Sequence, residues 1–225
     1  RMPRAGRRRN RTGTANRARG GDLRGRLFSA VAMVAPVAGA TNLSLDFEED
    51  MAKVGALARA NKEDLAALPG QARQLGRDTV FTASQAAEGM SFLAMAGFDT
   101  QDTMSAMPGL LQLAADGATD LGRTSDIASN ILSAFKIPAS DMVRVSDTLA
   151  KTFTSSNTTL EPLGETMKYV GPVASAVNMS LEDTAAAVGM LGNVGIQGSQ
   201  AGTSLRAALL RLAAPPKQAA EALLE

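Results

Sequence analysis

The segment best suited to chemistry is a run of glycines over residues 189–202, at Gly189, Gly192, Gly195, Gly198 and Gly202. With Thr203 and Ser204 behind it, such a segment could bind a phosphate through backbone amides, as a phosphate loop does. It lacks the lysine that precedes the Thr or Ser of a phosphate loop, and no strand is predicted before it. Five glycines in fourteen residues instead indicate a packed turn or a close approach of two backbones. We therefore predict a structural role for this glycine motif, and no cofactor.

Paired carboxylates are the second candidate, because a glycosidase needs two of them across a cleft. The pairs are Glu48 with Glu49, Asp99 with Asp102, and Glu182 with Asp183. Each pair lies at a predicted helix start, where capping and the helix dipole favour negative charge without any catalysis. The chain has no histidine and no cysteine, which removes His-based and Cys-based catalytic sites, the commonest metal ligand and any disulfide framework. We predict no catalytic and no metal site.

The charge of the chain is divided unevenly along its length. Residues 1–26 hold ten arginines and one acid, Asp22, whereas the other 199 residues have a net charge of −8. A basic head of this kind favours non-specific binding of polyanions such as DNA, but no aromatic residue precedes Phe28 to stack on bases. It also has almost no apolar side chain to bury, so we predict that residues 1–26 are disordered on their own.

Residues 27–41 form an apolar, Ala/Gly-rich segment. It is too short for a helix that spans a bilayer, and Pro36 interrupts it, so we predict no stable membrane span. Behind the arginines it imitates a secretory signal, and one hypothesis is a secreted or surface helical binding module with residues 1–40 as its export signal. The alternative is a small-residue helix that packs on the body of the protein.

The remaining sequence has the apolar period of helices throughout. Phe47, Met51, Val54 and Ala58 share one helix face. A similar stripe in the last helix consists of Leu205, Leu209 and Leu212. No stretch alternates with period two for long enough to predict a strand. We predict an all-α fold over residues 42–214, a compact multi-helix bundle of short amphipathic helices with no sheet.

Several local signals place the helix ends. Residues 82–85, Thr-Ala-Ser-Gln, match a capping box. Asp99 or Thr100 is predicted to cap the next helix, and Ser180 a later one. Pro69-Gly70 is predicted to interrupt a helix over residues 64–77. Residues 215–225 follow the body and are predicted to start a further helix, so that the chain is expected to be a fragment of a longer protein.

An internal repeat is indicated by two alignments within the chain. Residues 101–107 align with residues 182–188 at an offset of 81, and residues 88–94 align with residues 165–171 at an offset of 77. Two copies of a helical unit with pseudo-two-fold symmetry would explain both alignments. Amphipathic helices rich in alanine also resemble each other through composition alone, so both explanations stay open.

The sequence of the glycine motif resembles that of phage tail tape measure proteins of the TP901-like family. The resemblance covers most of residues 44–214 and rests on the order and spacing of further segments: Phe47–Val54, Ala94–Phe98, Ile131–Phe135, Lys168–Ala174 and Leu205–Leu209. It does not extend to the basic head.

The resemblance implies a structural, non-enzymatic protein of a phage or prophage tail. Such proteins are involved in tail assembly and tail length determination, and lie in the lumen of the virion tail after assembly in the host cytoplasm. The partners that the resemblance implies are tail tube subunits, baseplate or tip proteins, tail assembly chaperones and other copies of the protein itself.

Overall fold

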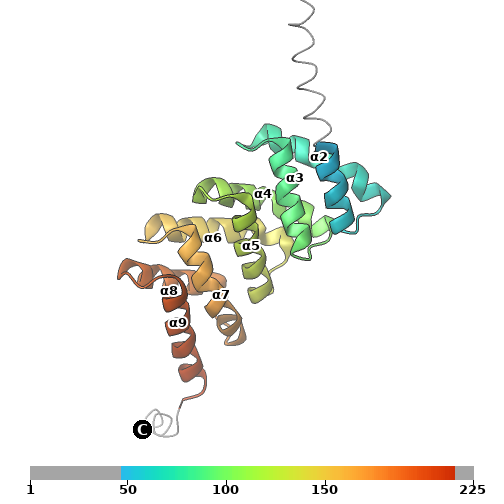
Figure 1. The fold of residues 1–225 in the computed structure, drawn as a ribbon. Helices are drawn as coiled ribbons and strands as arrows, with labels where there is room; N and C mark the ends of the chain where they lie inside the picture. The colour runs from blue at the N-terminus through green and yellow to red at the C-terminus, as the bar shows by residue number, and fades with distance from the viewer. Residues whose placement is uncertain (1–46, 216–225) are drawn as a thin grey trace, which may run out of the picture. The chain divides into compact units, whose positions relative to one another are not determined.

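The computed structural model describes residues 47–215, and every regular element within this range is a helix (Figure 1). A helical segment over residues 47–57 comes first. It is followed by α2 (Lys62–Asp78), α3 (Ala83–Met95), α4 (Thr100–Gly117), α5 (Leu121–Phe135), the short 3₁₀ helix η1 (Ala139–Asp141), α6 (Met142–Ser155), α7 (Leu160–Ala176), α8 (Leu181–Asn193) and α9 (Gly198–Ala213). The prediction of a compact all-α bundle without a sheet is confirmed for these residues. The predictions for residues 1–46 and 216–225 lie outside the described residues.

Polar residues begin the helices where the sequence predicts them. The Thr82 hydroxyl accepts a bond from the Gln85 amide at 3.2 Å, and the Gln85 side chain accepts one from the Thr82 amide at 2.8 Å, which completes the predicted capping box. Asp99 accepts from the amide of Asp102 at 2.8 Å, and Ser180 caps α8 in the same way. These bonds satisfy amides that a helix start leaves without a partner.

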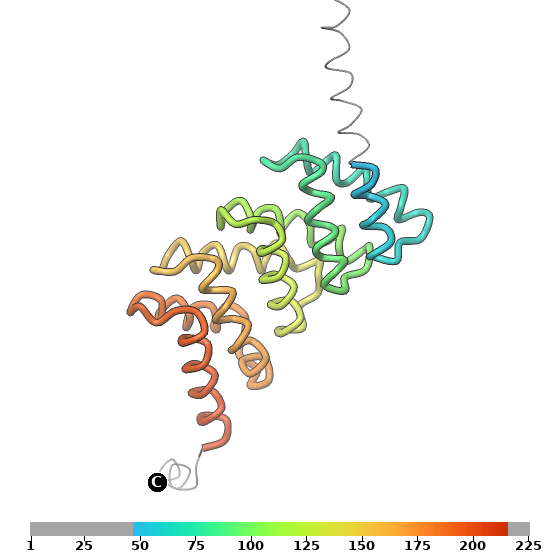
Figure 2. Tube along the Cα trace, in the orientation of Figure 1, coloured from blue at the N-terminus to red at the C-terminus, as the bar shows by residue number. Residues whose placement is uncertain are grey.

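The helices are stacked in two rows, which Figures 1 and 2 show from the same side. One row, called the even row, consists of α2, α4, α6 and α8, and each of its helices packs on the next one. The other row, the odd row, consists of α3, α5, α7 and α9, which also pack in order. Successive helices of the chain therefore alternate between the two rows, as in stacked helical hairpins.

The stacking has a regular spacing in the sequence. The odd-row helices begin at Ala83, Leu121, Leu160 and Gly198, which are 38 or 39 residues apart. The offsets of 77 and 81 in the sequence therefore pair α3 with α7 and α4 with α8, two hairpins further along the stack. The repeating unit is one hairpin, half the length that the alignments indicate.

The core lies between and within the two rows as one continuous cluster. The predicted stripe of Phe47, Met51, Val54 and Ala58 is buried. The stripe of α9 differs, because Leu205 and Leu209 are half-buried and Leu212 is 78% exposed.

Prolines do not break the helices in which they lie. The predicted interruption near Pro69-Gly70 is wrong, because α2 runs without a break from Lys62 to Asp78. Pro108 and Pro172 likewise lie inside α4 and α7. A proline removes one helix hydrogen bond and crowds the preceding turn, and here packing in the rows offsets that cost.

Candidate functional site

The glycine motif joins the last two helices of the described residues. Gly189 and Gly192 belong to α8, Gly195 lies in the turn, and Gly198 and Gly202 belong to the first turns of α9. All five therefore lie within one helical hairpin, the last one among the described residues. The motif faces two neighbours, the end of α6 with the connection to α7, and the part of α7 around Thr166 and Tyr169.

The two glycines of α8 allow this helix to lie against the end of α6 and the residues after it. A Cβ atom on Gly189 would lie 3.2 Å from the hydroxyl oxygen of Ser156. A Cβ atom on Gly192 would lie 3.3 Å from Cβ of Thr158 and 3.4 Å from the carbonyl oxygen of Asn157. Both glycines are buried, so the absence of a side chain permits a close contact here.

Two side chains at the turn between α8 and α9 form hydrogen bonds with the backbone of Asn157, one with its amide and one with its carbonyl oxygen. The side-chain oxygen of Asn193 accepts a hydrogen bond from the backbone amide of Asn157 at 2.8 Å. The side-chain amide of Gln197 donates to the carbonyl oxygen of the same residue. Gly195, between them, has a φ of +81°, and Gly198 has a φ of +60°. Gly195 permits the left-handed backbone of the turn that presents both side chains to Asn157.

The closest contact of the motif is between α9 and α7. A Cβ atom on Gly202 would lie 2.7 Å from Cβ of Tyr169 and 2.8 Å from the carbonyl oxygen of Thr166. The buried Thr166 hydroxyl lies 3.0 Å from the Gly198 carbonyl oxygen and 2.8 Å from that of Pro162, to either of which it can donate. The two helices therefore meet backbone to backbone at one buried point.

Close contacts between helices at a glycine also occur elsewhere in the stack. A Cβ atom on Gly109 of α4 would lie 2.7 Å from the backbone nitrogen of Val143 in α6, and one on Gly164 of α7 would lie 2.6 Å from the side chain of Ile127 in α5. Small residues at these points allow neighbouring helices of a row to approach closely. Sequence reasoning identifies only the dense motif near the end, because a single glycine in a helical pattern gives no comparable signal.

The geometry of the motif differs from that of a phosphate loop. Its turn lies between two helices, whereas a phosphate loop follows a strand. The glycines at Gly189, Gly192 and Gly202 face protein atoms at contact distance. The arrangement can hold helices together and fix the angle at which the last hairpin meets the one before it.

The carboxylate pairs do not meet across a cleft. Asp99 and Asp102 belong to the start of α4, and Asp183 bonds to the hydroxyl of Ser180 at 2.7 Å at the start of α8. Glu182 instead forms an ion pair with Arg144 of α6 at 2.5 Å. Within residues 47–215, no cluster of three potential metal ligands occurs.

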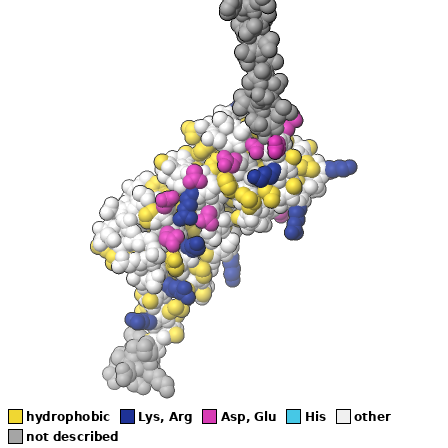
Figure 3. Space-filling view, in the orientation of Figure 1, with side chains coloured by type: hydrophobic (Ala, Val, Ile, Leu, Met, Phe, Trp, Pro, Cys, Tyr) yellow, Lys and Arg dark blue, Asp and Glu magenta, His cyan; other side chains and the backbone are white. Residues whose placement is uncertain are grey.

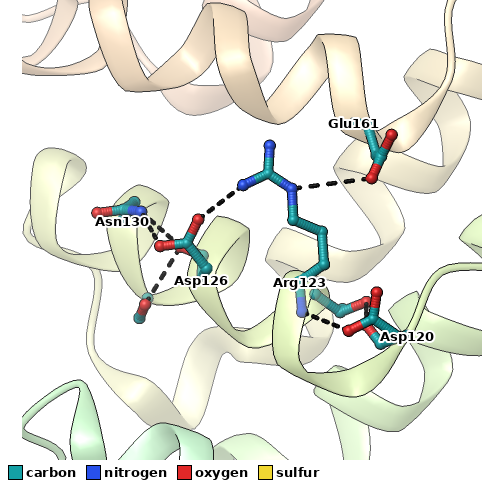
Figure 4. Close-up of polar contacts among 7 residues, drawn as sticks. Asp120, Arg123, Asp126, Asn130 and Glu161 are labelled. Atoms are coloured by element: carbon teal, nitrogen blue, oxygen red, sulfur yellow. Dashed lines mark hydrogen bonds and ion pairs between the residues drawn. The ribbon is translucent and has the colours of Figure 1, made fainter.

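A polar network that the sequence did not reveal links α5 to α7 (Figure 4). Asp120 caps α5 by accepting from the backbone amide of Arg123 at 2.9 Å. The Arg123 guanidinium donates to Asp126 at 2.9 Å and lies 3.9 Å from Glu161 of α7. Asp126 also accepts from the side-chain amide of Asn130 at 2.9 Å. Arg123 and Asp126 are three residues apart in a helix, which is the one signal that could have indicated their pairing.

The face shown in Figure 3 carries acidic and basic side chains interspersed with apolar ones. The described part of that face therefore shows no broad field of one sign. Among residues 47–215, no helix is both long enough and apolar enough to cross a membrane.

The described residues form a helical packing module, a stack of hairpins that is held by close backbone contacts. Comparison with protein families identifies the family: the chain belongs to the phage-related minor tail protein family, whose model matches residues 70–225. No solved structure matches the chain.

Several curated phage proteins are similar to the chain. The tape measure protein of Pneumococcus phage Dp-1 is 43% identical over 172 residues, which are 76% of this chain and 15% of that protein. The probable tape measure protein of Escherichia phage P2 is 35% identical over 162 residues, 72% of this chain and 20% of that protein. The probable tape measure protein of Clostridium phage phiCD119 is 28% identical over 151 residues, 65% of this chain and 16% of that protein. The chain therefore spans a fifth or less of the length of these relatives.

Proposed function

We propose that the chain is a structural, non-enzymatic part of a phage or prophage tail tape measure protein. The observation that carries the proposal is its 43% identity, over three quarters of its length, to a protein named as a tape measure protein. The family match over residues 70–225 supports the same conclusion. These comparisons favour a tail protein over a secreted module, whose export signal over residues 1–40 lies outside the described residues.

In this proposal the described residues act as a folded module and not as part of an extended ruler. The longest described helix, α4, has 18 residues and is about 27 Å long at 1.5 Å per residue. The helices fold back on one another in two rows. The chain therefore advances along the stack by much less than the 1.5 Å per residue of one continuous helix. Tail length determination is then the task of other parts of the full protein.

The partners in this proposal are the tail tube subunits, baseplate or tip proteins, tail assembly chaperones and further copies of the protein. The protein acts in the host cytoplasm during assembly and then lies in the lumen of the tail. The narrower assignment to the TP901-like group stays a prediction, as does the structural role of the five glycines.

The proposal is tested in a phage that carries the gene. A stop codon early in the coding region should give particles without tails or with aberrant tails, and mass spectrometry of purified wild-type tails should detect peptides from residues 47–215. Normal tails on the particles of the stop-codon phage, confirmed by electron microscopy, would contradict a role in tail assembly.

A further inference from the structure

The C-terminal halves of three successive odd-row helices carry basic side chains and no acidic ones. Residues 129–136 of α5, 168–176 of α7 and 206–213 of α9 contain no Asp or Glu. Their basic side chains are all exposed: Lys136, Lys168, Arg206 and Arg211. The face in Figure 3 carries both signs as a whole, but toward its lower end, over α9, the charged side chains are Lys and Arg alone.

Two of these cations line one groove between α5 and α7. The groove has a volume of about 490 Å³, and its polar lining consists of Lys136, Lys168, Asn130, Ser133 and Ser175. Alanines and one proline make up the rest, and no carboxylate lines it. The groove therefore presents two ammonium groups and two hydroxyl groups, all of which can donate hydrogen bonds to an anion.

Arg206 continues the pair of lysines onto α9. The helices α7 and α9 begin at Leu160 and Gly198, so Lys168 and Arg206 are each the eighth residue after the first residue of their helix. They take equivalent places in the odd row. We call Lys136, Lys168 and Arg206 the basic strip, because they follow one another across α5, α7 and α9.

Close contacts fix the spacing of these helices beside the basic strip. A Cβ atom on Gly171 of α7 would lie 3.1 Å from Cβ of Ala134 in α5, two residues before Lys136. The contact of Gly202 with α7 lies one turn before Arg206. Packed helices have axes about 8–10 Å apart, so the strip is a series of cations at that spacing on rigid elements.

The acidic side chains around the basic strip take part in other contacts. Glu165, three residues before Lys168, lines a separate groove together with Arg123. Glu182 lines a further groove and is paired with Arg144. Within residues 47–215, no cation of the basic strip forms an ion pair.

We propose that the basic strip binds the phosphate groups of a DNA backbone. Cations and hydroxyl groups are the donors that sequence-independent phosphate contacts use. A protein partner matches the strip less well, because protein interfaces are centred on buried apolar or aromatic anchors, and the groove has only alanines and one proline to offer. The inference rests on the described helices, so it depends neither on the basic head nor on the role of the protein in a phage tail.

Acetylation of lysines in the full chain tests the proposal. The chain is treated with an acetylating reagent with and without a short DNA duplex, and mass spectrometry gives the rate at each lysine. With DNA bound to about two thirds of the molecules, acetylation of Lys136 and Lys168 should slow about threefold. Lys62 and Lys151, which are exposed on even-row helices, are the controls in the same molecule and should keep their rates.

The salt dependence of DNA binding gives a second measurement. Each phosphate contact contributes about 0.9 to the slope of log affinity against log salt concentration, so replacing all three cations of the basic strip by glutamine should lower the slope by about 2.7. The matched control replaces Lys53, Lys62 and Lys151 by glutamine, removes the same charge and should leave the slope nearly unchanged. The basic head is the same in both variants, and circular dichroism confirms that both are folded.

Four results would overturn the proposal. The first is that DNA slows acetylation of all four lysines equally, or of none. The second is an equal salt slope in the two triple variants. The third is equal protection of Lys136 and Lys168 by polyglutamate, which would assign the strip to an acidic protein. The fourth is equal protection by inorganic phosphate, which would assign the groove to a small anion.

Discussion

Gly202 of α9 lies so close to Thr166 of α7 that a Cβ atom on the glycine would stand 2.8 Å from the carbonyl oxygen of the threonine. The obstacle is backbone, which cannot move aside as a flexible side chain can. Tyr169, one turn further along α7, has its Cβ atom 2.7 Å from the same point. The contact between the last two odd-row helices therefore depends on the absence of a side chain at one position.

Gly202→Ala should destabilise the protein because the new methyl group forces α7 and α9 apart. We expect a loss of about 1–3 kcal/mol in the free energy of unfolding, the usual cost of overpacking. Urea unfolding followed by circular dichroism measures it. The control is Gly70→Ala in α2, where a Cβ atom would meet nothing within 4 Å and a gain of about 0.5–1 kcal/mol is expected. Equal stability changes in the two variants would contradict the close contact.

The turn of the glycine motif should tolerate only residues that accept a left-handed backbone. Gly195 has a φ of +81° with open space around its Cβ position, so substitution tests the backbone alone. Gly195→Val should cost about 1–3 kcal/mol, whereas Gly195→Asn should cost less because asparagine enters this region more readily. Thermal unfolding of the two variants checks this order. A valine variant that kept its thermal stability and lost affinity for a nucleotide would favour the phosphate-loop hypothesis instead.

Helix ends and buried stripes follow from the sequence because both depend on residues a few positions apart. The capping box at Thr82 and the buried face of Phe47, Met51 and Val54 are of this kind. The continuity of α2 through Pro69 could not be predicted locally, because tertiary packing outweighs a missing helix bond. The alternation of helices between two rows could not be predicted either, since it is set by contacts such as that of Gly109 with α6, far apart in the sequence.

The sequence predicts a packing role for the glycine motif, but it does not indicate which residues the motif contacts. Nothing in the sequence of residues 155–159 indicates that Asn157 contacts the turn between α8 and α9. Asn193 and Gln197 bond to its backbone and not to its side chain. The exposed state of Leu212 was also beyond sequence reasoning, since periodicity shows which residues can be buried but not what covers them.

The two bonds to Asn157 should fix the connection between α6 and α7. Replacing Asn193 and Gln197 by alanine removes both side chains and should cost about 0.5–1.5 kcal/mol for each hydrogen bond at this exposed site. Hydrogen exchange of the Asn157 amide should become faster, because its acceptor is Asn193. Asn130→Ala is the matched control, since that side chain bonds to Asp126 within α5. Unchanged exchange at Asn157 in the double variant would show that the bonds do not form in solution.

The basic head should be dispensable for the stability of the helical body. Residues 1–26 have almost no apolar side chain to bury, and their ten arginines repel one another. Deleting them should leave the melting temperature nearly unchanged and should weaken any salt-dependent affinity for DNA. Differential scanning calorimetry and DNA binding at two salt concentrations measure these effects. A large fall in melting temperature would show instead that the head packs on the acidic body.

Removing the helical module from the gene of a phage should not shorten its tail in proportion to the residues removed. The 169 residues from 47 to 215 would span about 250 Å as one continuous helix. They are instead folded into helices of at most 18 residues that pack in two rows, so they contribute little length along any axis. We expect failed assembly or aberrant tails of irregular length. In-frame deletions in the sequence that follows the module are the matched control and should shorten tails by about 1.5 Å per residue if that sequence is helical and extended. Electron microscopy decides between the two cases. Intact tails that are uniformly about 250 Å shorter would mean that the module unfolds into the ruler, and the folded-module proposal would then be wrong.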